Sequence, residues 1–206
     1  MKKNTTVGLL AACSLFAVNL FAINESHATE EASYHPGWLD ELMIIGVYTN
    51  DDNRFDGLFM RFWGSNRHSS NSNPGEGSYI YGELELGGFD TSGLLTSGAL
   101  MGLGYQMGIP DQDLAFGFIG ADINYRAFNV DGGDSDSDIA LGLEVGLRAA
   151  LNPDLLGEAI FRIDTNDFID QPSLRIGGAY KRFYLSMTRF LDDGANRIQL
   201  GYTFEM

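Results

Sequence analysis

Histidine and serine are the residues of this chain that could support nucleophilic catalysis. His68 is followed directly by Ser69 and Ser70 in a polar segment, and His35 is the other histidine beyond residue 28. A histidine base activates a serine hydroxyl when the two side chains meet and a third group orients the ring. Sequence neighbours rarely aim their side chains at each other, and no orienting group is evident. We therefore expect solvated loop histidines and no catalytic site.

A run of aspartates over residues 131–138 could bind a divalent cation. The EF-hand loop needs glycine at its sixth position and a bidentate glutamate at its twelfth. In this chain Ile139 and Val145 occupy those positions. We expect an acidic solvated loop rather than a metal site, and no cofactor. The aspartates concerned are Asp131, Asp134, Asp136 and Asp138.

Charge and cysteine content exclude further classes of function. The chain of 206 residues carries a formal net charge of −15, which opposes binding to nucleic acid, because neutralising phosphates requires lysine and arginine. The only cysteine is Cys13. Thiolate chemistry, a cysteine-based zinc site and a disulfide scaffold are therefore not expected.

The first 28 residues have the features of a signal peptide. Two lysines precede an apolar stretch over residues 7–23, and Ser26-His27-Ala28 supplies small residues for cleavage. We predict that residues 1–28 are removed and that 29–41 form an N-terminal periplasmic segment. A competing interpretation is the lipoprotein-like sequence Leu10-Ala11-Ala12-Cys13. The apolar run continues beyond Cys13, which favours the cleavable signal.

The rest of the chain, over 42–206, alternates between apolar and polar residues. Between Ile139 and Arg148 every odd position is a large aliphatic residue, and the even positions are small or charged. Successive side chains of a β-strand point to opposite faces, so this pattern predicts a strand with one apolar and one polar face. No stretch after Ala28 has about 18 consecutive apolar residues, the length that a transmembrane helix needs.

The alternation recurs often enough to define an all-β fold. We count ten strands of about ten residues, joined by polar turns such as Lys181-Arg182, and find no second domain. Ten strands with both termini in the periplasm leave 65–77 as a long periplasmic segment. A barrel of eight strands, with 42–50 outside the sheet, would avoid this long periplasmic segment. It would, however, place the acidic loop over 131–138 in the periplasm.

The polar face carries charges of both signs. Beyond residue 28 the chain has one lysine and ten arginines, and arginine is favoured in enclosed, bidentate ion pairs. We predict a lumen network in which arginines pair with carboxylates across the barrel. Its predicted members are Arg61, Arg126, Arg148, Arg162 and Arg175 with Glu83, Glu85, Asp122, Glu144 and Asp164.

Aromatic residues fall mostly near the expected strand ends, as in the girdles of a membrane barrel. These are Trp63, Tyr79, Tyr105, Tyr125, Phe128, Tyr180, Phe183, Tyr184, Phe190 and Tyr202. A sheet in lipid must close, because open edges leave backbone groups unsatisfied. The prediction is a closed, antiparallel, up-and-down transmembrane β-barrel. A soluble periplasmic, lipocalin-like barrel with an apolar interior is the alternative.

On these residues the chain resembles the small Gram-negative outer-membrane β-barrels, the class that includes OmpA-like and OmpX-like proteins. The most specific segment is Ile198–Met206, which resembles the C-terminal signal read by the barrel-assembly machinery. Its key residues are Tyr202, Phe204 and Met206; the class usually ends in Phe, and this chain ends in Met206. The resemblance implies insertion in the outer membrane among its lipids and lipopolysaccharide.

Within that class, the sequence favours a non-enzymatic barrel with a structural or surface-interaction role. In a barrel of eight to ten strands side chains nearly fill the interior, so we expect a plugged lumen. A small porin-like channel is the alternative. Some barrels of the class are lipid A-modifying enzymes, which need a poised base that this chain does not evidently supply. We expect an extracellular partner, where there is one, to bind at the outside loops.

Overall fold

Ten antiparallel β-strands make up nearly all of the chain that the structure describes. This computed structural model describes residues 41–50, 57–66, 77–88, 94–109, 112–130, 135–165, 172–192 and 194–204. The strands are β1 (Glu41–Asn50), β2 (Gly57–Asn66), β3 (Gly77–Gly87), β4 (Leu94–Ile109), β5 (Gln112–Val130), β6 (Ser135–Asn152), β7 (Leu155–Asp164), β8 (Ser173–Tyr180), β9 (Phe183–Phe190) and β10 (Asn196–Phe204). The ten-strand prediction is confirmed, and the eight-strand alternative is wrong.

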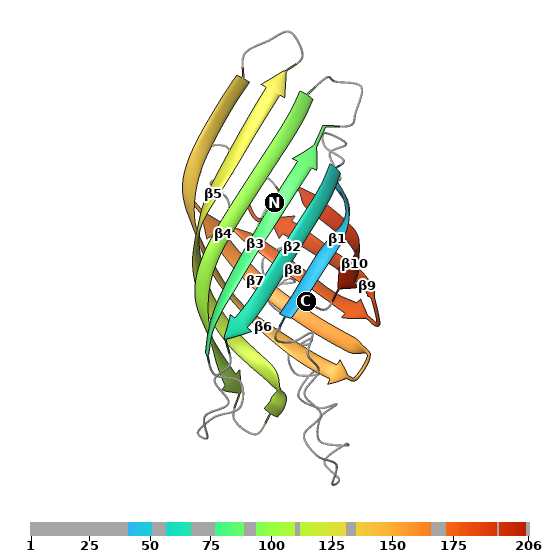
Figure 1. Ribbon diagram of the computed structural model, residues 1–206. Helices are drawn as coiled ribbons and strands as arrows, with labels where there is room; N and C mark the ends of the chain where they lie inside the picture. Colours follow the sequence, from blue (N-terminus) through green and yellow to red (C-terminus); the bar gives the residue numbers. More distant parts are fainter. Residues whose placement is uncertain are drawn as a thin grey trace, which may run out of the picture. The chain divides into compact units, whose positions relative to one another are not determined.

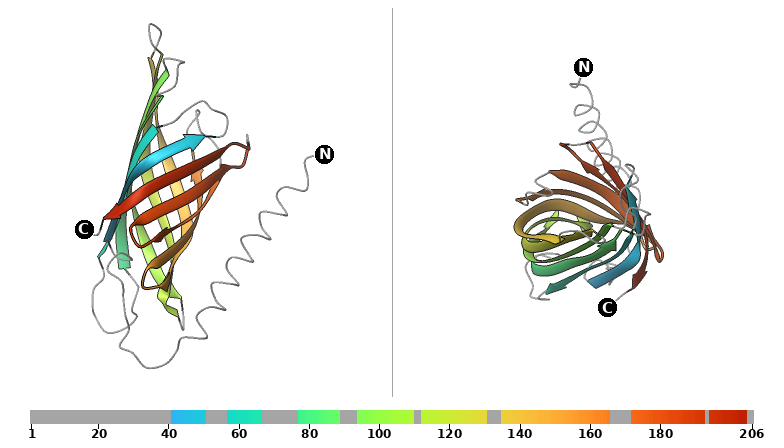
Figure 2. Two further views of the ribbon diagram at one scale, coloured as in Figure 1. Left: turned by 90° about the vertical axis from the view of Figure 1, so that its right-hand side faces the viewer. Right: turned by 90° about the horizontal axis from the view of Figure 1, so that it is seen from above.

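The strands form a closed barrel with up-and-down topology (Figure 1). Each strand pairs with its neighbours in the sequence, and β1 pairs with β10 to close the ring. In that closing pair Ile45 lies opposite Tyr202 and Val47 opposite Leu200. Figure 2 shows the ring along its length and from above. Closure leaves neither β1 nor β10 with an exposed edge.

The two ends of the barrel differ in their connections. At one end, here called the terminal end, lie the start of β1, the end of β10 and three two-residue connections, 110–111, 153–154 and 181–182. The longer connection over 67–76 is also at this end. The other end, here called the loop end, has five connections of four or more residues. The Lys181-Arg182 turn joins β8 and β9, as the sequence predicts.

Three strands are much longer than predicted. β4, β5 and β6 have 16, 19 and 18 residues, whereas the other strands have 8 to 11. The expected length of about ten residues is wrong for these three. The additional part of β5 includes Phe116 and Phe118, which are buried on the inward face. Because these two inward residues are apolar, the sequence does not alternate between apolar and polar residues there. The pattern therefore does not predict this part of the strand.

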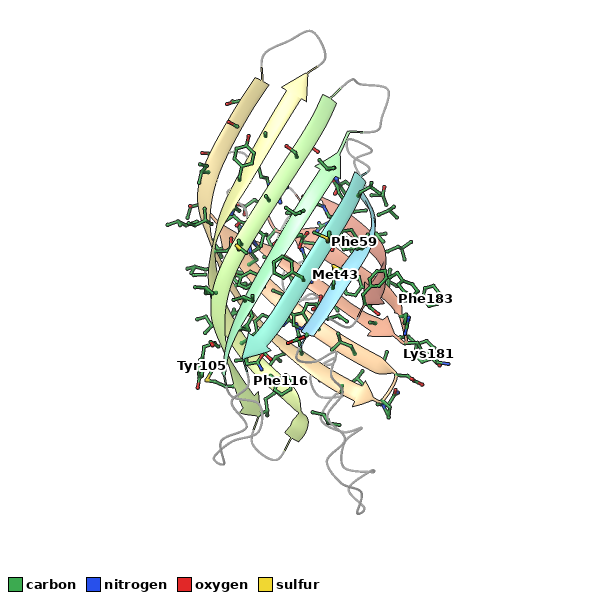
Figure 3. The ribbon with its side chains drawn as sticks, viewed as in Figure 1. Met43, Phe59, Tyr105, Phe116, Lys181 and Phe183 are labelled. Atoms are coloured by element: carbon green, nitrogen blue, oxygen red, sulfur yellow. The ribbon has the colours of Figure 1, made fainter. Side chains whose placement is uncertain are left out.

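The outward face is apolar along the strands. On β6, Ile139, Leu141 and Leu143 are 70%, 63% and 59% exposed, although they are large aliphatic side chains. Tyr105 projects from the outer side of β4, and Phe183 projects beside the β8–β9 turn (Figure 3). The polar residues of the same strands point inward and are buried. The barrel therefore has its charges inside and its large apolar side chains outside.

Four of the predicted girdle aromatics face the interior instead, namely Trp63, Tyr79, Tyr184 and Phe190, and the ring of Phe190 lines the lumen cavity. Trp63, Tyr79 and Tyr184 are each 1% exposed. The reason is strand parity: Trp63 lies two residues after the inward Arg61, and Tyr79 lies two residues before the inward Tyr81. The side chain of Phe128 lies outside the described set. Five others are exposed on the outer face: Tyr105, Tyr125, Tyr180, Phe183 and Tyr202.

The buried apolar residues gather mainly at the terminal end of the lumen. Leu42, Ile44, Trp63, Phe118 and Leu156 belong to one packed cluster. All five come from strand segments near that end, so they fill its cross-section with aliphatic and aromatic side chains. Within the described segments, no helix is long and apolar enough to span a membrane.

Candidate functional site

Buried polar side chains of the described residues lie in the lumen, and Arg148, which is 3% exposed, is one of them. The Arg148 guanidinium lies between two rings, with Cζ 4.1 Å from the Trp63 centroid and 4.5 Å from that of Phe118. Stacking of this kind stabilises a cation with little water around it. Arg148 Nε also donates to Glu158 Oε2 at 3.4 Å. These contacts hold a buried cation near the terminal end of the lumen.

Glu158 joins this cation to a second arginine. Arg61 Nη1 donates to Glu158 Oε1 at 2.7 Å, and the Tyr184 hydroxyl donates to the same oxygen at 2.7 Å. The Glu158 side chain is fully buried. Charge-assisted hydrogen bonds to a desolvated carboxylate are the strong class of hydrogen bond. Glu158 is therefore the carboxylate that holds Arg61 and Arg148 in the interior.

A second group of ion pairs surrounds Arg162. Its Nη1 and Nη2 atoms donate to the two Asp122 oxygens, each at 2.7 Å, in a bidentate pair. Arg162 Nε and Nη2 also donate to Asp164, at 2.8 and 2.5 Å. The Tyr81 hydroxyl donates a hydrogen bond to Asp122, and the Asn124 amide donates one to Asp164, each at 2.7 Å.

A glycine makes the room that the Arg162 group occupies. A Cβ atom on Gly142 would collide with the Arg162 guanidinium and would lie 2.5 Å from Asp122 Oδ1. Gly142 also pairs with Asp164 in the β6–β7 ladder. Side chains this close to a backbone need a residue without a Cβ. The inward glycines are thus part of the ion-pair geometry.

Nearer the loop end, Glu85 bridges two arginines. Arg126 Nη1 lies 2.9 Å from Glu85 Oε2, and Arg197 Nη1 lies 2.5 Å from Glu85 Oε1. Arg197 Nε also donates to Asn50 Oδ1 at 3.1 Å, and its Cζ lies 4.6 Å from the Tyr48 ring centroid. Glu85 therefore links β3, β5 and β10 across the lumen.

Glu83 and Glu144 occupy the middle of the lumen. Arg175 donates through both terminal nitrogens to Glu83 Oε2, each at 3.2 Å, and Arg61 Nε lies 3.9 Å from the same oxygen. Glu144 accepts a hydrogen bond from the Tyr79 hydroxyl at 3.1 Å and lies 4.0 Å from Arg162 Nη1. Glu144 is thus more weakly paired than the other carboxylates.

All ten residues predicted for the lumen network lie on the inward faces of their strands. The structure brings together predicted partners in four cases: Arg61–Glu83, Arg126–Glu85, Arg162 with Asp122, Asp164 and Glu144, and Arg175–Glu83. Among the described residues, Arg148 forms its ion pair with Glu158 and with none of the five predicted carboxylates.

Sequence reasoning missed two members of this network, Glu158 and Arg197. Both stand at inward positions of their strands. The alternation of faces alone would have included them, because Glu158 lies on the same face as Arg162 and Arg197 lies on the same face as Gln199. With them, six arginines and six carboxylates of the described residues share the lumen. Their formal charges cancel.

One cavity in the lumen lies among the charges. This cavity of about 50 Å³ is lined by Glu83, Glu85, Arg126, Arg162 and Arg175, among others. A polar cavity of this size holds a few water molecules. The side chain of Arg126 is 25% exposed, whereas that of Arg148 is 3% exposed. The Arg126 side chain is therefore more accessible to water than that of Arg148.

The other predicted sites lie mainly outside the described residues. His35, His68, Asp131, Asp134 and Met206 all fall there. Of the acidic loop, Asp136 and Asp138 are described, and each accepts a hydrogen bond from the backbone N–H of the next residue at 2.8 Å. Among the residues that are placed, no group of three or more candidate metal ligands occurs.

The C-terminal strand presents its aromatic residues to the outside. Tyr202 and Phe204 are both exposed on β10, with ring centroids 5.1 Å apart. Phe183 of β9 packs edge-on against Tyr202 at 6.0 Å. The three rings form an outward aromatic group at the terminal end.

Comparisons with known proteins find similar solved structures. No protein family profile matches the chain, and no curated protein matches it. The chain is similar in fold to solved outer-membrane β-barrels.

Three of these structures illustrate the similarity. Ail, the attachment invasion locus protein of Yersinia pestis, is 15% identical, with 80% of this chain and 95% of Ail covered and a TM-score of 0.41. The N-terminal β-barrel domain of Pseudomonas aeruginosa OprF is 12% identical, covering 80% of this chain and 98% of that domain, with a TM-score of 0.38. The KdgM porin is 10% identical, covering 80% and 99%, with a TM-score of 0.41. These similarities select no function.

Proposed function

We propose that this protein is an integral outer-membrane β-barrel with a closed lumen and a structural or surface-interaction role. The large apolar side chains on the outer face, here called the outer belt, support the membrane location. If Ile139, Leu141 and Leu143 faced water, each would lose the free energy that is gained when an apolar side chain is removed from water. A soluble lipocalin-like barrel would place these residues inside. The inward charges support the same orientation.

The unequal ends support an orientation in the membrane. Bacterial barrels have short periplasmic turns and longer outside loops. The terminal end, with its three two-residue connections, then faces the periplasm, and the loop end faces outward. Outer-membrane lipid and lipopolysaccharide contact the belt. The aromatic group at Tyr202 and Phe204 is suited to reading by the barrel-assembly machinery.

The observation that carries the functional proposal is the seal around Arg148. Trp63 and Phe118 enclose its guanidinium, and Leu42, Ile44 and Leu156 fill the same end of the barrel. Ions cannot cross an apolar and aromatic layer of this kind without rearrangement of its side chains. The role then falls to the outer surface and to the outside loops.

Planar-bilayer recording of the purified protein tests the closed lumen. We expect no steady single-channel conductance from the wild type. The Trp63→Ala/Arg148→Ala variant removes the seal and should conduct, which shows that insertion was successful. Steady wild-type conductance whose ion selectivity changes in Glu144→Gln would overturn the proposal in favour of a porin.

That porin-like channel is the second candidate, and the cavity of about 50 Å³ beside Arg126 and Arg175 favours it. Widening of this cavity toward the terminal end would have to displace Trp63. The silent wild type together with a conducting seal variant would exclude it.

Cell fractionation and lipid analysis test the rest of the proposal. Resistance to carbonate extraction and heat-modifiable gel mobility are expected of an outer-membrane barrel, and release with the periplasmic fraction would contradict it. Lipid A mass spectra should be the same with and without the protein. An acyl-chain difference that His68→Ala abolishes would show that the barrel is an enzyme.

A further inference from the structure

The outer belt is not equally tall around the barrel. On β6 it runs from Ile139 to Leu147, and every second residue of this stretch is an exposed, large aliphatic side chain. On β9 it runs only from Phe183 to Met187. The strands differ in the same way, with 18 residues in β6 and 8 in β9 (Figure 1). The belt therefore covers four residue steps on β9 and eight on β6.

Two polar contacts between β9 and β10 mark the limits of the belt on these strands. At the terminal end, Arg182 Nη1 donates to the Tyr202 hydroxyl at 3.4 Å. At the loop end, Arg189 Nη1 donates to Asn196 Oδ1 at 2.9 Å. Cationic and amide groups favour the membrane–water interface, so the apolar layer lies between these two contacts. The strand register places three residue pairs there: Phe183 with Tyr202, Leu185 with Leu200, and Met187 with Ile198.

Polar residues limit the belt on β1 as well. Glu41 and Thr49 are exposed outward residues of this strand, and the apolar outward residues between them extend only from Met43 to Val47. β1 pairs with β10, so the short belt continues across the closing pair of strands. The three strands β9, β10 and β1 are here called the short sector.

Strand geometry converts these lengths into heights across the membrane. A strand rises about 3.4 Å per residue and is tilted by about 40° in a membrane barrel. The belt is then about 10 Å tall on β9 and about 20 Å tall on β6. The apolar band of bacterial barrels is about 25 Å tall. The β6 side is close to this height, and the short sector is far below it.

The charged limit at the loop end cannot move away from the belt easily. Arg189 is tied to Asn196, and a Cβ atom on Gly194 would lie 2.8 Å from Arg189 Nη2. The guanidinium is therefore packed against the turn that follows β9. In that turn Leu191 is followed by two aspartates, so the turn belongs to the polar layer. Where side chains cannot extend toward water, a bilayer that is thicker than the belt becomes thinner.

We propose that the short sector binds a locally thinned bilayer, so that the protein narrows the outer membrane beside its closing strands. This inference rests on the proposed membrane location of the outer belt. The partner of the short sector is lipid whose chains span less than the usual height, and the partner of β6 is lipid of ordinary thickness.

Nitroxide labels on single cysteines test the proposal by measuring local depth. The only cysteine of the chain is Cys13, so Leu185→Cys and Leu143→Cys in a Cys13→Ser background each carry one label at the middle of the belt. Oxygen concentrates in the bilayer centre and a nickel chelate in water, and the ratio of their effects on the label reports its depth. In dioleoylphosphatidylcholine vesicles we expect the Leu185 label about 5 Å nearer to water than the Leu143 label, half of the difference in belt height.

Labels at the two limits separate thinning from a tilt of the whole barrel. The nickel chelate should reach the labels of both Arg182→Cys and Arg189→Cys if the bilayer is thinned between them. If the barrel tilts instead, one of these two labels would lie as deep as the Leu143 label, and the proposal would be wrong.

Lengthening the belt should reverse the effect. Arg189→Leu adds an apolar outward residue to β9 and should move the Leu185 label deeper. Ser137→Leu adds one to β6 and is the matched control, which should leave the Leu143 label unchanged. In dilauroylphosphatidylcholine vesicles the depths of the Leu185 and Leu143 labels should converge, because the hydrocarbon layer is thinner.

Two outcomes in the dioleoyl vesicles would overturn the proposal. One is equal depth of the Leu185 and Leu143 labels. The other is a Leu185 label shielded from both oxygen and the nickel chelate, which would show that a second copy of the chain covers the short sector. A Leu143 label in water would instead refute the membrane location of the outer belt.

Discussion

Removing the Glu158 carboxylate is the most informative perturbation of the lumen. Glu158 is fully buried and accepts hydrogen bonds from Arg61, Tyr184 and Arg148. In Glu158→Ala, Arg61 keeps only the ion pair with Glu83 at 3.9 Å, and Arg148 loses the one ion pair that it forms among the described residues. Breaking a buried ion pair from one side costs about 3–5 kcal/mol.

We therefore expect Glu158→Ala to lower the free energy of unfolding by about 3–5 kcal/mol. Urea unfolding of the vesicle-inserted barrel, followed by tryptophan fluorescence, measures this as a lower midpoint at unchanged slope. Asp136→Ala is the matched control, because Asp136 is exposed at the loop end and bonds only to its neighbour's N–H in the described structure. Its effect should stay within about 0.5 kcal/mol.

A double variant identifies the physical cause. Adding Arg148→Met to Glu158→Ala removes a cation that the first change leaves without its carboxylate, so part of the lost stability should return. Replacing both members of a buried pair by apolar groups is often neutral. A Glu158→Ala effect below about 1 kcal/mol, or a double variant less stable than Glu158→Ala, would refute the assignment of Glu158 as the central carboxylate.

Two further predictions concern the glycine that accommodates the network and the outer belt. Gly142→Ala should destabilise the barrel by about 1–3 kcal/mol, because its Cβ would meet Asp122 and Arg162. Gly117→Ala is the control and should be neutral, because the nearest contact of its Cβ is Leu147 at 3.8 Å. Equal urea midpoints for the two variants would contradict the close packing of side chains around Gly142. Leu143→Arg places a charge in the outer belt and should cost about 2–4 kcal/mol of insertion stability. Ser137→Arg is the control and should change the insertion stability little, because Ser137 is exposed near the loop end. If both arginine variants lowered the yield of vesicle insertion equally, the outer belt would not face lipid.

Strand parity made the lumen residues predictable, and it also explains what was missed. Arg162, Glu144 and Asp122 stand at positions that alternate with large aliphatic residues, so their common face follows from the backbone alone. The same test applied to Trp63 and Glu158 would have placed both inside. The error with Trp63 came from treating aromatic residues near strand ends as a girdle without checking their parity.

Partner choice within the lumen could not be predicted from the sequence. Arg61 and Glu158 are 97 residues apart, and their contact depends on the register of every strand between β2 and β7. A shift of one residue in any pair would turn one of them to the outside. The short Arg162–Asp164 contact is the exception, since two residues on one strand share a face whatever the register.

The charge balance of the lumen has a consequence for the order of assembly. In β1–β5 the network contains two arginines and three carboxylates, and in β6–β10 it contains four arginines and three carboxylates. Glu85 meets Arg197, and Glu83 meets Arg175, only when the two halves come together. Either half alone would hold uncompensated charges that lipid cannot solvate. Closure of the barrel therefore completes the neutralisation, and the growing sheet must remain in a hydrated environment until its last strand pairs with the first.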